Sequence, residues 1–403
     1  FAEEIRKFVL NDYSLMSIAD LHNNKIFESA TVPSCIPVVT KKRSKKHSVK
    51  ITEYTDGEFK IKYQIDILRY HQTNQNMFRT ENLNLISDLI DRIRQNGNIL
   101  ERDFYVSTGA EIHGKESRAS DGTTISGTSK FDVLYEKFSK GLKPYIEGSA
   151  IQKSKDGRYS YPIIDTWLDY DKADIMRSPK FKELFDNNKI IVRGSSGLLR
   201  ILAIYDERKI YTSHKCTMII PRDCLPKNIN QFAIKTEVEL KYILGIINSR
   251  LIDFYYESVY GGFIDVYPNN LKELPIKDAD ESKRKAIIAV VEYLIELKKI
   301  TSRNAMNKIM CLFFDSLIDA IVYELYFSES VKKHNAEVIE LVKKEIPDIS
   351  QRKDEQDKLE IIEKVYEKLN QPNNAIMQRI SRQNSDVEEI KIINQSQSKQ
   401  TKA

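Results

Sequence analysis

Apolar residues recur with helical spacing at the start of the chain, near its middle and throughout its C-terminal third. Residues 1–11 place Ile5, Phe8 and Val9 on one face, and residues 238–259 repeat apolar positions in the same way. Four further segments share this period, 282–300, 306–327, 331–346 and 355–369. Residues 371–403 are rich in Gln, Asn, Ser and Lys, and we expect a disordered tail there.

Shorter apolar runs predict strands elsewhere. Residues 14–21, 34–40 and 58–65 have strand patterns, and 142–222 contains several short β-rich runs separated by turn residues. This favours a mostly antiparallel β domain. Residues 105–130 are rich in Gly, Ser and Thr, which predicts one long loop. The fold class is therefore predicted as α+β.

Composition narrows the class of protein. A chain of 403 residues with 41% hydrophobic residues is large enough for two or three domains. No apolar run reaches about 18 residues and no secretory leader opens the sequence, so we expect a cytoplasmic protein without a membrane partner. The four cysteines are scattered without metal-ligand spacing, which predicts buried, reduced thiols and neither zinc nor disulfides.

The net charge of +5 is unevenly distributed. Residues 189–222 hold seven basic residues against two acids, Asp206 and Glu207, within a region that is otherwise close to neutral. The seven basic residues are Lys189, Arg193, Arg200, Arg208, Lys209, Lys215 and Arg222. Concentrated positive charge of this kind is typical of surfaces that meet nucleic-acid phosphates.

Three ordered segments resemble a known family. They are 105–151, with the Gly-containing entry YVSTGAEIHG; 181–221, with KIIVRG and IYTSHKCTMIIP; and 240–276, with Asn248-Ser249 and a closing Leu274-Pro275-Ile276. Together they resemble the TaqI-like C-terminal specificity domain of adenine-specific DNA methyltransferases and type IIG restriction enzymes. No single motif among these segments would identify the family. The resemblance is specific because all the segments occur in the expected order.

The flanking segments extend the resemblance to a division of the chain. Residues 1–80 resemble the end of an α/β methyltransferase domain, and 81–278 form the mostly β target-recognition domain, which also contains helices. Residues 279–370 form a helical region, in which LFFDSLIDAIVYELYF (312–327) resembles a helix that follows these domains. The chain opens with Phe inside a helical pattern, so we expect a methyltransferase portion upstream of it. The resemblance leaves open whether a nuclease portion also lies there.

The resemblance implies double-stranded DNA as the partner and target recognition for adenine-N6 methylation in a bacterial restriction–modification system as the function. The sequence contains no Pro-Pro and no Gly-rich cofactor loop, although the family needs Asn-Pro-Pro-Tyr/Phe for the extruded adenine and a glycine loop for S-adenosylmethionine. We therefore expect this chain to bind DNA without catalytic residues or cofactor, while the complete enzyme uses S-adenosylmethionine.

The candidate DNA-binding residues lie in two turns and one loop. Gly194 and Gly197 permit close backbone approach, basic side chains suit guanine or phosphate, and hydroxyls or imidazole suit base or backbone. The set is Arg193, Ser195, Ser196, Arg200, Thr212, Ser213, His214, Lys215 and Lys130. The alternative for 193–200 is an ordinary hairpin turn with solvated arginines.

We expect structural or solvent-exposed roles for several other polar and aromatic residues. Lys153, Lys155 and Arg158 are expected at a charged hairpin tip, Tyr161 and Trp167 in the core, and the basic run 41–46 in solvent.

Two other functions remain open at this stage. One is a stand-alone specificity subunit that serves separate modification subunits. Such subunits usually carry two recognition domains, whereas this sequence shows only one recognition-like segment. The other is a helical interaction protein without a DNA role. Packing within the protein already explains the amphipathic helices, which weakens this alternative.

Overall fold

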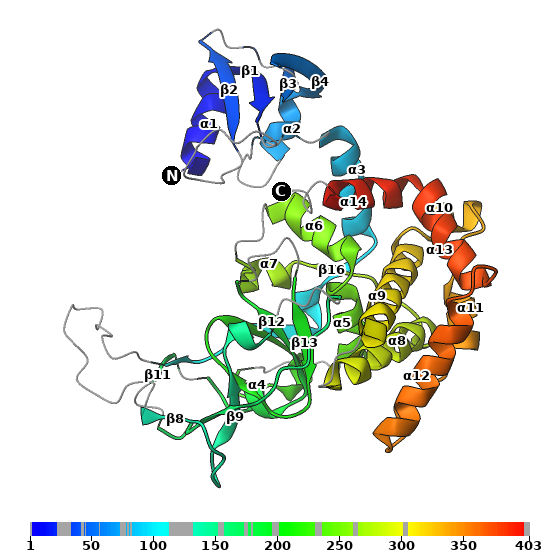
Figure 1. Cartoon of the computed structure of the whole chain (residues 1–403). Helices are drawn as coiled ribbons and strands as arrows, with labels where there is room; N and C mark the ends of the chain where they lie inside the picture. Colours follow the sequence, from blue (N-terminus) through cyan, green and yellow to red (C-terminus); the bar gives the residue numbers. More distant parts are fainter. Residues whose placement is uncertain are drawn as a thin grey trace. The chain divides into compact units, whose positions relative to one another are not determined.

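The computed structural model describes residues 2–21, 34–41, 44, 46–55, 57–72, 78, 80, 83–112, 132–151, 157–172, 176–178, 180–195, 201–229, 236–260, 265–300 and 305–398. The chain divides into two compact units (Figure 1). The first comprises 1–94, 258–261 and 397–403, and the second comprises 95–257 and 262–396. No helix within the described ranges is long and apolar enough to cross a membrane.

The first unit is a four-stranded sheet with helices. Its elements are α1 (Ala2–Asp12), β1 (Ser14–Asp20), β2 (Cys35–Thr40), β3 (Ser48–Thr55), β4 (Glu58–Asp66), α2 (Ile67–Gln72) and α3 (Leu83–Gln95). The strand order is β2-β1-β3-β4, with β1 antiparallel to β2 and parallel to β3. Leu15, Ile18, Val49 and Ile51 are fully buried in its core. The predicted helix at 1–11 and strands at 14–21, 34–40 and 58–65 are confirmed.

Two small sheets build the β-rich part of the second unit. The first has the order β13-β12-β15-β6 and is antiparallel throughout, and the second has the order β14-β9-β10-β8. Their strands are β6 (Phe104–Thr108), β12 (Lys189–Arg193), β13 (Ala203–Asp206) and β15 (Cys216–Pro221), and β8 (Leu134–Tyr135), β9 (Lys143–Ile146), β10 (Thr166–Leu168) and β14 (Tyr211–Thr212). Apolar side chains of both sheets share one core, which includes Tyr145, Leu168, Ile191, Tyr211 and Met218. The prediction of a mostly antiparallel β domain is confirmed, with β14 and β9 as a parallel exception.

Short elements complete this part. Two-strand pairs join β5 (Asn98–Ile99) to β16 (Pro275–Ile276) and β7 (Glu111–Ile112) to β11 (Met176–Ser178). The remaining short helices are η2 (Leu100–Arg102), η4 (Gly148–Ala150), α4 (Glu183–Asp186) and η6 (Arg222–Cys224). The prediction of one loop over 105–130 is wrong at its start, because β6 alternates buried Phe104 and Val106 with half-buried residues and pairs with β15. Residues 113–131 lie outside the described ranges.

The expected single helix over 238–259 is two helices, α5 (Leu240–Ile247) and α6 (Arg250–Tyr260). The break falls at Asn248-Ser249. The buried Asn248 amide donates to the carbonyl of Ala203 and accepts from its N–H, at 3.0 and 3.2 Å. Ser249 Oγ accepts the N–H of Ile252, so it satisfies a donor in the first turn of α6. This residue pair therefore attaches the helices to β13.

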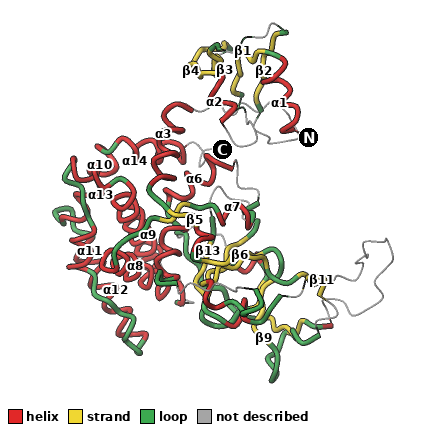
Figure 2. The backbone as a smooth tube through the Cα atoms, turned by 180° about the vertical axis from the view of Figure 1, so that it is seen from behind, coloured by secondary structure: helices red, strands yellow, loops and turns green. Residues whose placement is uncertain are grey.

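Seven helices follow α7 (Pro268–Lys272) in the described part of the chain, and they gather on one side of the second unit (Figure 2). They are α8 (Glu281–Lys299), α9 (Ala305–Tyr326), α10 (Ser328–Lys333), α11 (Ile339–Glu345), α12 (Glu355–Leu369), α13 (Ala375–Asp386) and α14 (Glu388–Ser398). The predicted helix over 331–346 is thus split. Val338 and Ile339 donate their N–H groups to the Glu324 carboxylate, which satisfies the start of α11.

The expected disordered tail after 370 is wrong over 375–398, where α13 and α14 form. Ile376, Ile380, Val387, Ile390 and Ile393 are buried. The buried Gln383 amide donates to the carbonyls of Ala320 and Ala336. The polar composition concealed a sparse apolar stripe, which is stabilised by packing rather than by local propensity.

The division into compact units does not follow the predicted boundaries at 80 and 278. The first unit extends to residue 94, and the β-rich and helical parts belong to one compact unit. Close packing of α5 on α8 shows why: a Cβ added to Gly245 would lie 2.4 Å from Ile287 Cγ2. Helices this close cannot separate as an independent domain without exposing their cores.

A buried ionic cluster connects these two parts. Arg158 is 7% exposed, and its guanidinium lies 3.1 to 3.4 Å from the carboxylates of Asp253 on α6 and Asp315 and Asp319 on α9. Arg250 Nε adds a contact of 3.1 Å to Asp319. The interpretation of Arg158 as part of a hairpin tip is therefore wrong. Burial lowers the pKa of Arg158, but the three carboxylates outweigh burial and raise it, so the residue stays charged.

Arg158→Met is expected to lower the free energy of unfolding of the second unit by about 3–5 kcal/mol, because it leaves buried carboxylates without their counter-charge. Arg352→Met is the matched control, since the Arg352–Asp357 pair is about half exposed on both sides, and its loss should cost less than about 1 kcal/mol. Urea denaturation measures both values. Equal, small losses would contradict a central role for the cluster.

Candidate nucleic-acid interface

One end of the β12–β15 pair forms a compact set of turns. Arg193 lies opposite Cys216 in the ladder, and the N–H of Gly194 donates to the carbonyl of Lys215 at 2.8 Å. The chain reverses between β14 and β15, where the Cys216 N–H donates to the Ser213 carbonyl at 3.0 Å. We call residues 213–216 the Lys215 turn. Its backbone is fixed by ladder bonds on both sides.

Three side chains in the described part of this end are exposed to solvent. His214 and Lys215 are exposed, and Ser195 is exposed beside them. Arg193 is half-buried: its Nε donates to the Ser195 carbonyl at 2.7 Å and its Nη1 to the Ile151 carbonyl at 3.0 Å. Arg193 therefore holds the neighbouring turn in place, with only part of its guanidinium free to donate elsewhere.

Two of the predicted contact residues do not face solvent. Thr212 is fully buried and its hydroxyl contacts Met218 Sδ at 3.6 Å. Ser213 is 6% exposed, and its hydroxyl accepts the Lys215 N–H at 3.4 Å. The prediction that these hydroxyls contact DNA is wrong, because the two-residue strand β14 places them inside the domain. They stabilise the turn instead.

Three predicted contact residues, Ser196, Arg200 and Lys130, lie outside the described residues, as do Lys153 and Lys155. The basic run 41–46 is described only at Lys41, Ser44 and Lys46, all of which are exposed.

The seven basic residues of 189–222 do not form one surface. Lys189 is fully buried and pairs with Asp206 at 2.5 Å, and Arg222 Nε donates to the Glu101 carbonyl. Because β12 and β15 are antiparallel, Lys189 and Arg222 lie at the end of the sheet opposite Arg193 and Lys215, about 13 Å away for four residues of strand. The inference of one basic surface is therefore wrong, and the accessible positive charge at the Lys215 end is smaller.

The last residue of the Lys215 turn, Cys216, is buried. Burial, assisted by Glu147, raises the pKa of the Cys216 thiol to about 12. The thiol is therefore neutral near pH 7, and it acts as an apolar support rather than as a nucleophile or metal ligand. Among the described residues, no group of three His, Cys, Asp or Glu side chains is placed to hold a metal ion.

An exposed aromatic residue beside this end was not predicted. The N–H of Val266 donates to the Gly194 carbonyl at 2.6 Å, and the next residue, Tyr267, is 57% exposed. Tyr267 precedes Pro268 at the start of α7. An extended residue before a helix-initiating proline was visible in the sequence as a marker of a fixed backbone. Tyr161 and Trp167, expected in the core, are only half-buried.

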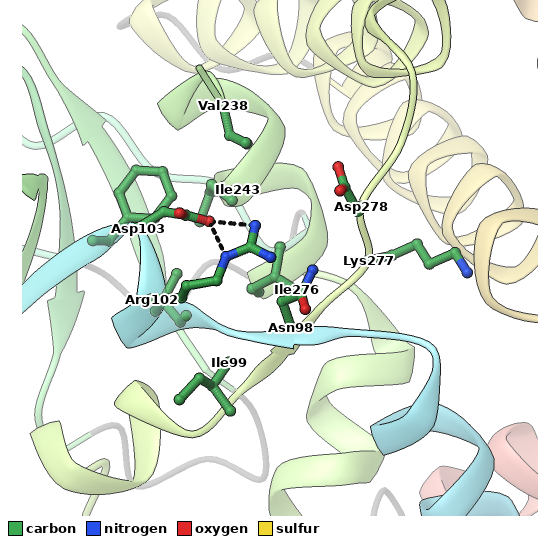
Figure 3. A pocket seen from close by; sticks show the side chains of 11 residues that line it. Asn98, Ile99, Arg102, Asp103, Val238, Ile243, Ile276, Lys277 and Asp278 are labelled. Atoms are coloured by element: carbon green, nitrogen blue, oxygen red, sulfur yellow. Dashed lines mark hydrogen bonds and ion pairs between the residues drawn. The ribbon is translucent and has the colours of Figure 1, made fainter. Parts of the chain in front are cut away.

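The cavity drawn in Figure 3 is lined by residues of other segments than the Lys215 turn. It lies beside the β5–β16 pair, where Arg102 donates to Asp103 through Nε and Nη2 at 2.9 and 2.7 Å. Its volume of about 10 Å³ leaves room for no more than one water molecule. The closing residues of the specificity motif lie here: the Leu274 carbonyl accepts the Leu100 N–H, and the Pro275 carbonyl accepts Tyr326 OH. Their role is structural.

Comparison with known proteins identifies the β-rich part. Residues 143–276 match the family model of TaqI-like C-terminal specificity domains. The match covers about a third of the chain and agrees with the resemblance that its sequence shows.

Individual relatives agree with this assignment. Over 269 residues the chain is 26% identical to a candidate type II restriction enzyme and methyltransferase of Methanocaldococcus jannaschii, covering 64% of this chain and 20% of that protein. The chain thus spans about a fifth of the length of this curated relative.

Two solved structures are similar at a lower level. The type IIL restriction–modification enzyme MmeI, solved in complex with DNA, gives a TM-score of 0.35 at 10% identity, covering 89% of this chain and 46% of that one. The HsdS subunit of Thermoanaerobacter tengcongensis gives 0.25 at 10% identity, covering 60% and 52%.

Gly109→Ala is expected to disrupt the Lys215 turn, because the added Cβ would lie 2.2 Å from the Thr212 carbonyl oxygen and 2.4 Å from that of Ser213. Overpacking of this kind costs about 1–3 kcal/mol or more in the free energy of unfolding, which chemical denaturation measures. In the control Gly148→Ala the closest approach is 3.3 Å, to the Lys215 carbonyl, so a smaller loss is expected. A wild-type stability for Gly109→Ala would show that the turn is not so constrained.

Proposed function

We propose that this chain recognises a DNA sequence on behalf of an adenine-N6 methyltransferase of a restriction–modification system. The observation that carries the proposal is the Lys215 turn, an exposed His-Lys pair on a backbone fixed by ladder bonds within a TaqI-like specificity domain. A rigid turn with exposed donors suits recognition, since little conformational entropy is lost on binding.

The chemistry of the two side chains divides the work of recognition. The Lys215 ammonium is a compact positive charge that suits a phosphate oxygen or the O6 and N7 acceptors of guanine. The His214 imidazole both donates and accepts, so it can read a base edge or a phosphate. The exposed Ser195 hydroxyl lies beside them as a further donor. Phosphate contacts position the domain, and base-edge contacts select the sequence.

We assign the methyl transfer itself to another part of the enzyme. The printed sequence contains no Pro-Pro, so the Asn-Pro-Pro-Tyr/Phe motif that holds an extruded adenine is absent from it. We assign that motif and the S-adenosylmethionine site to polypeptide outside these 403 residues. In this scheme the specificity domain selects the adenine, and the catalytic part flips and methylates it.

Lys215→Ala should weaken binding to all duplexes alike if Lys215 contacts phosphate, and the slope of log affinity against log salt should fall by about 1. Should it read guanine instead, the loss of about 1–3 kcal/mol is confined to one base position. Fluorescence anisotropy with labelled duplexes at several salt concentrations separates the two results. Lys227→Ala, which removes an exposed lysine from the loop after η6, is the control and should bind as wild type. Identical binding by both variants would refute a role for the turn.

Methyl transfer is tested with the complete open reading frame that encodes this chain. With labelled S-adenosylmethionine and mixed-sequence duplex DNA, it should methylate the exocyclic nitrogen of adenine in one sequence context, whereas the 403-residue chain should transfer no methyl group. Methylated cytosine, or adenine methylated without regard to context, would contradict the proposal.

A further inference from the structure

The turn between β8 and β9 presents an exposed aromatic ring, Phe138, which packs against Trp167 on β10. Residues 136–142 form this turn, in which the Leu142 N–H donates to the Ser139 carbonyl at 3.1 Å and Gly141 has a φ of +98°. Phe138 is 66% exposed, and its ring meets the edge of Trp167 with centroids 4.8 Å apart and an interplanar angle of 63°. A phenyl ring this exposed gains little from the fold itself.

The register of the sheet explains why the Trp167 ring lies on the outer face. Trp167 on β10 lies directly opposite Tyr135 on β8 and Pro144 on β9, so these three side chains share one face. Leu168, the next residue, is fully buried in the core on the other face. The outer face therefore carries a row of rings from three adjacent strands.

Positive charge accompanies the rings. Lys137 and Lys140 are exposed on the turn and have no ion-pair partner within the described part of the chain, while Glu136 is the acid beside them. Lys172 donates to Tyr135 OH at 3.2 Å, lies 5.8 Å from its ring centroid and pairs with Asp169 at 3.5 Å. The turn itself thus adds two unpaired ammonium groups to an aromatic surface, a combination typical of nucleic-acid contacts.

The topology places this turn apart from the Lys215 turn on the same sheet. β14 runs parallel to β9, with Thr212 opposite Ile146, so the Lys215 turn lies beyond the ends of these strands. The 136–142 turn lies before the start of β9, about 13 Å or more away along the strand direction. Figure 1 shows β8 and β9 on the side of the second unit away from α8–α14. The two turns can therefore contact different nucleotides of one duplex.

We propose that the 136–142 turn is a second DNA-contact element, which grips the duplex backbone while the Lys215 turn faces the bases. Lys137 and Lys140 contact phosphate oxygens, and Phe138 packs on a deoxyribose or base edge with Trp167 supporting it. This inference rests on the proposed function, which makes double-stranded DNA the partner, and the unpaired positive charges suit its phosphates.

The chain itself provides a reporter for the test. Trp167 is its one tryptophan, so the indole emission of the whole protein comes from this element. Duplex DNA is titrated into the full 403-residue chain, and Trp emission is recorded together with the anisotropy of a labelled duplex. Both signals should change with the same midpoint.

The charge variant Lys137→Gln/Lys140→Gln should lower the salt slope of log affinity by about 2, since each phosphate contact contributes about 0.9. The matched control is Lys332→Gln/Lys333→Gln, which removes two adjacent exposed lysines from α10 and should leave the slope unchanged.

Each outcome decides the inference. Binding by anisotropy with unchanged Trp emission, or with an unchanged slope in the 137/140 variant, overturns the second contact element while sequence recognition stands. No binding by anisotropy to any duplex overturns both the contact element and the proposed function.

Discussion

The burial of Arg158 among three carboxylates is the constraint on which the second unit depends. A guanidinium can leave water only if counter-charges accompany it, and here they come from α6 and α9. Asp253 extends the constraint to the β-rich part, because its carboxylate also accepts the Ile201 N–H just before β13. The β-rich part and the helices therefore bury these charges together, and neither part is complete without the other. The two turns that we propose contact DNA belong to this same compact unit.

Local periodicity was sufficient to predict most elements of the fold. α1, β1, α8, α9 and α12 follow apolar patterns that their own residues carry, and each was expected within a few residues of its observed bounds. Prediction failed where a distant partner decides the structure. The break at Asn248 depends on the backbone of Ala203, and α13 depends on carbonyls that Gln383 reaches on other segments. Neither partner is visible in the local sequence.

The candidate site could be predicted only in part, because long-range pairing also decides which of its side chains are exposed. Exposed His214 and Lys215 were anticipated from the turn composition, whereas Thr212 was misassigned because a two-residue strand is too short to show an inward and outward alternation. The prediction of one basic surface from residues 189–222 failed because charge was counted along the chain. Antiparallel pairing places Lys189 and Lys215 at opposite ends of the sheet. Arg158 was predicted to be solvated because a basic residue next to Gly157 is typical of a hairpin tip. Its carboxylate partners lie far away in the sequence and could not be found from the local pattern.

The central claim is that a rigid turn in a TaqI-like specificity domain reads DNA sequence, and selection from a randomised duplex library tests it most directly. Successive rounds of capture by the 403-residue chain, followed by sequencing, should enrich one short sequence. The double variant His214→Ala/Lys215→Ala should relax the preference at the positions that the turn contacts. Enrichment of no sequence by the wild-type chain, or an identical enriched sequence from the variant, would contradict the account.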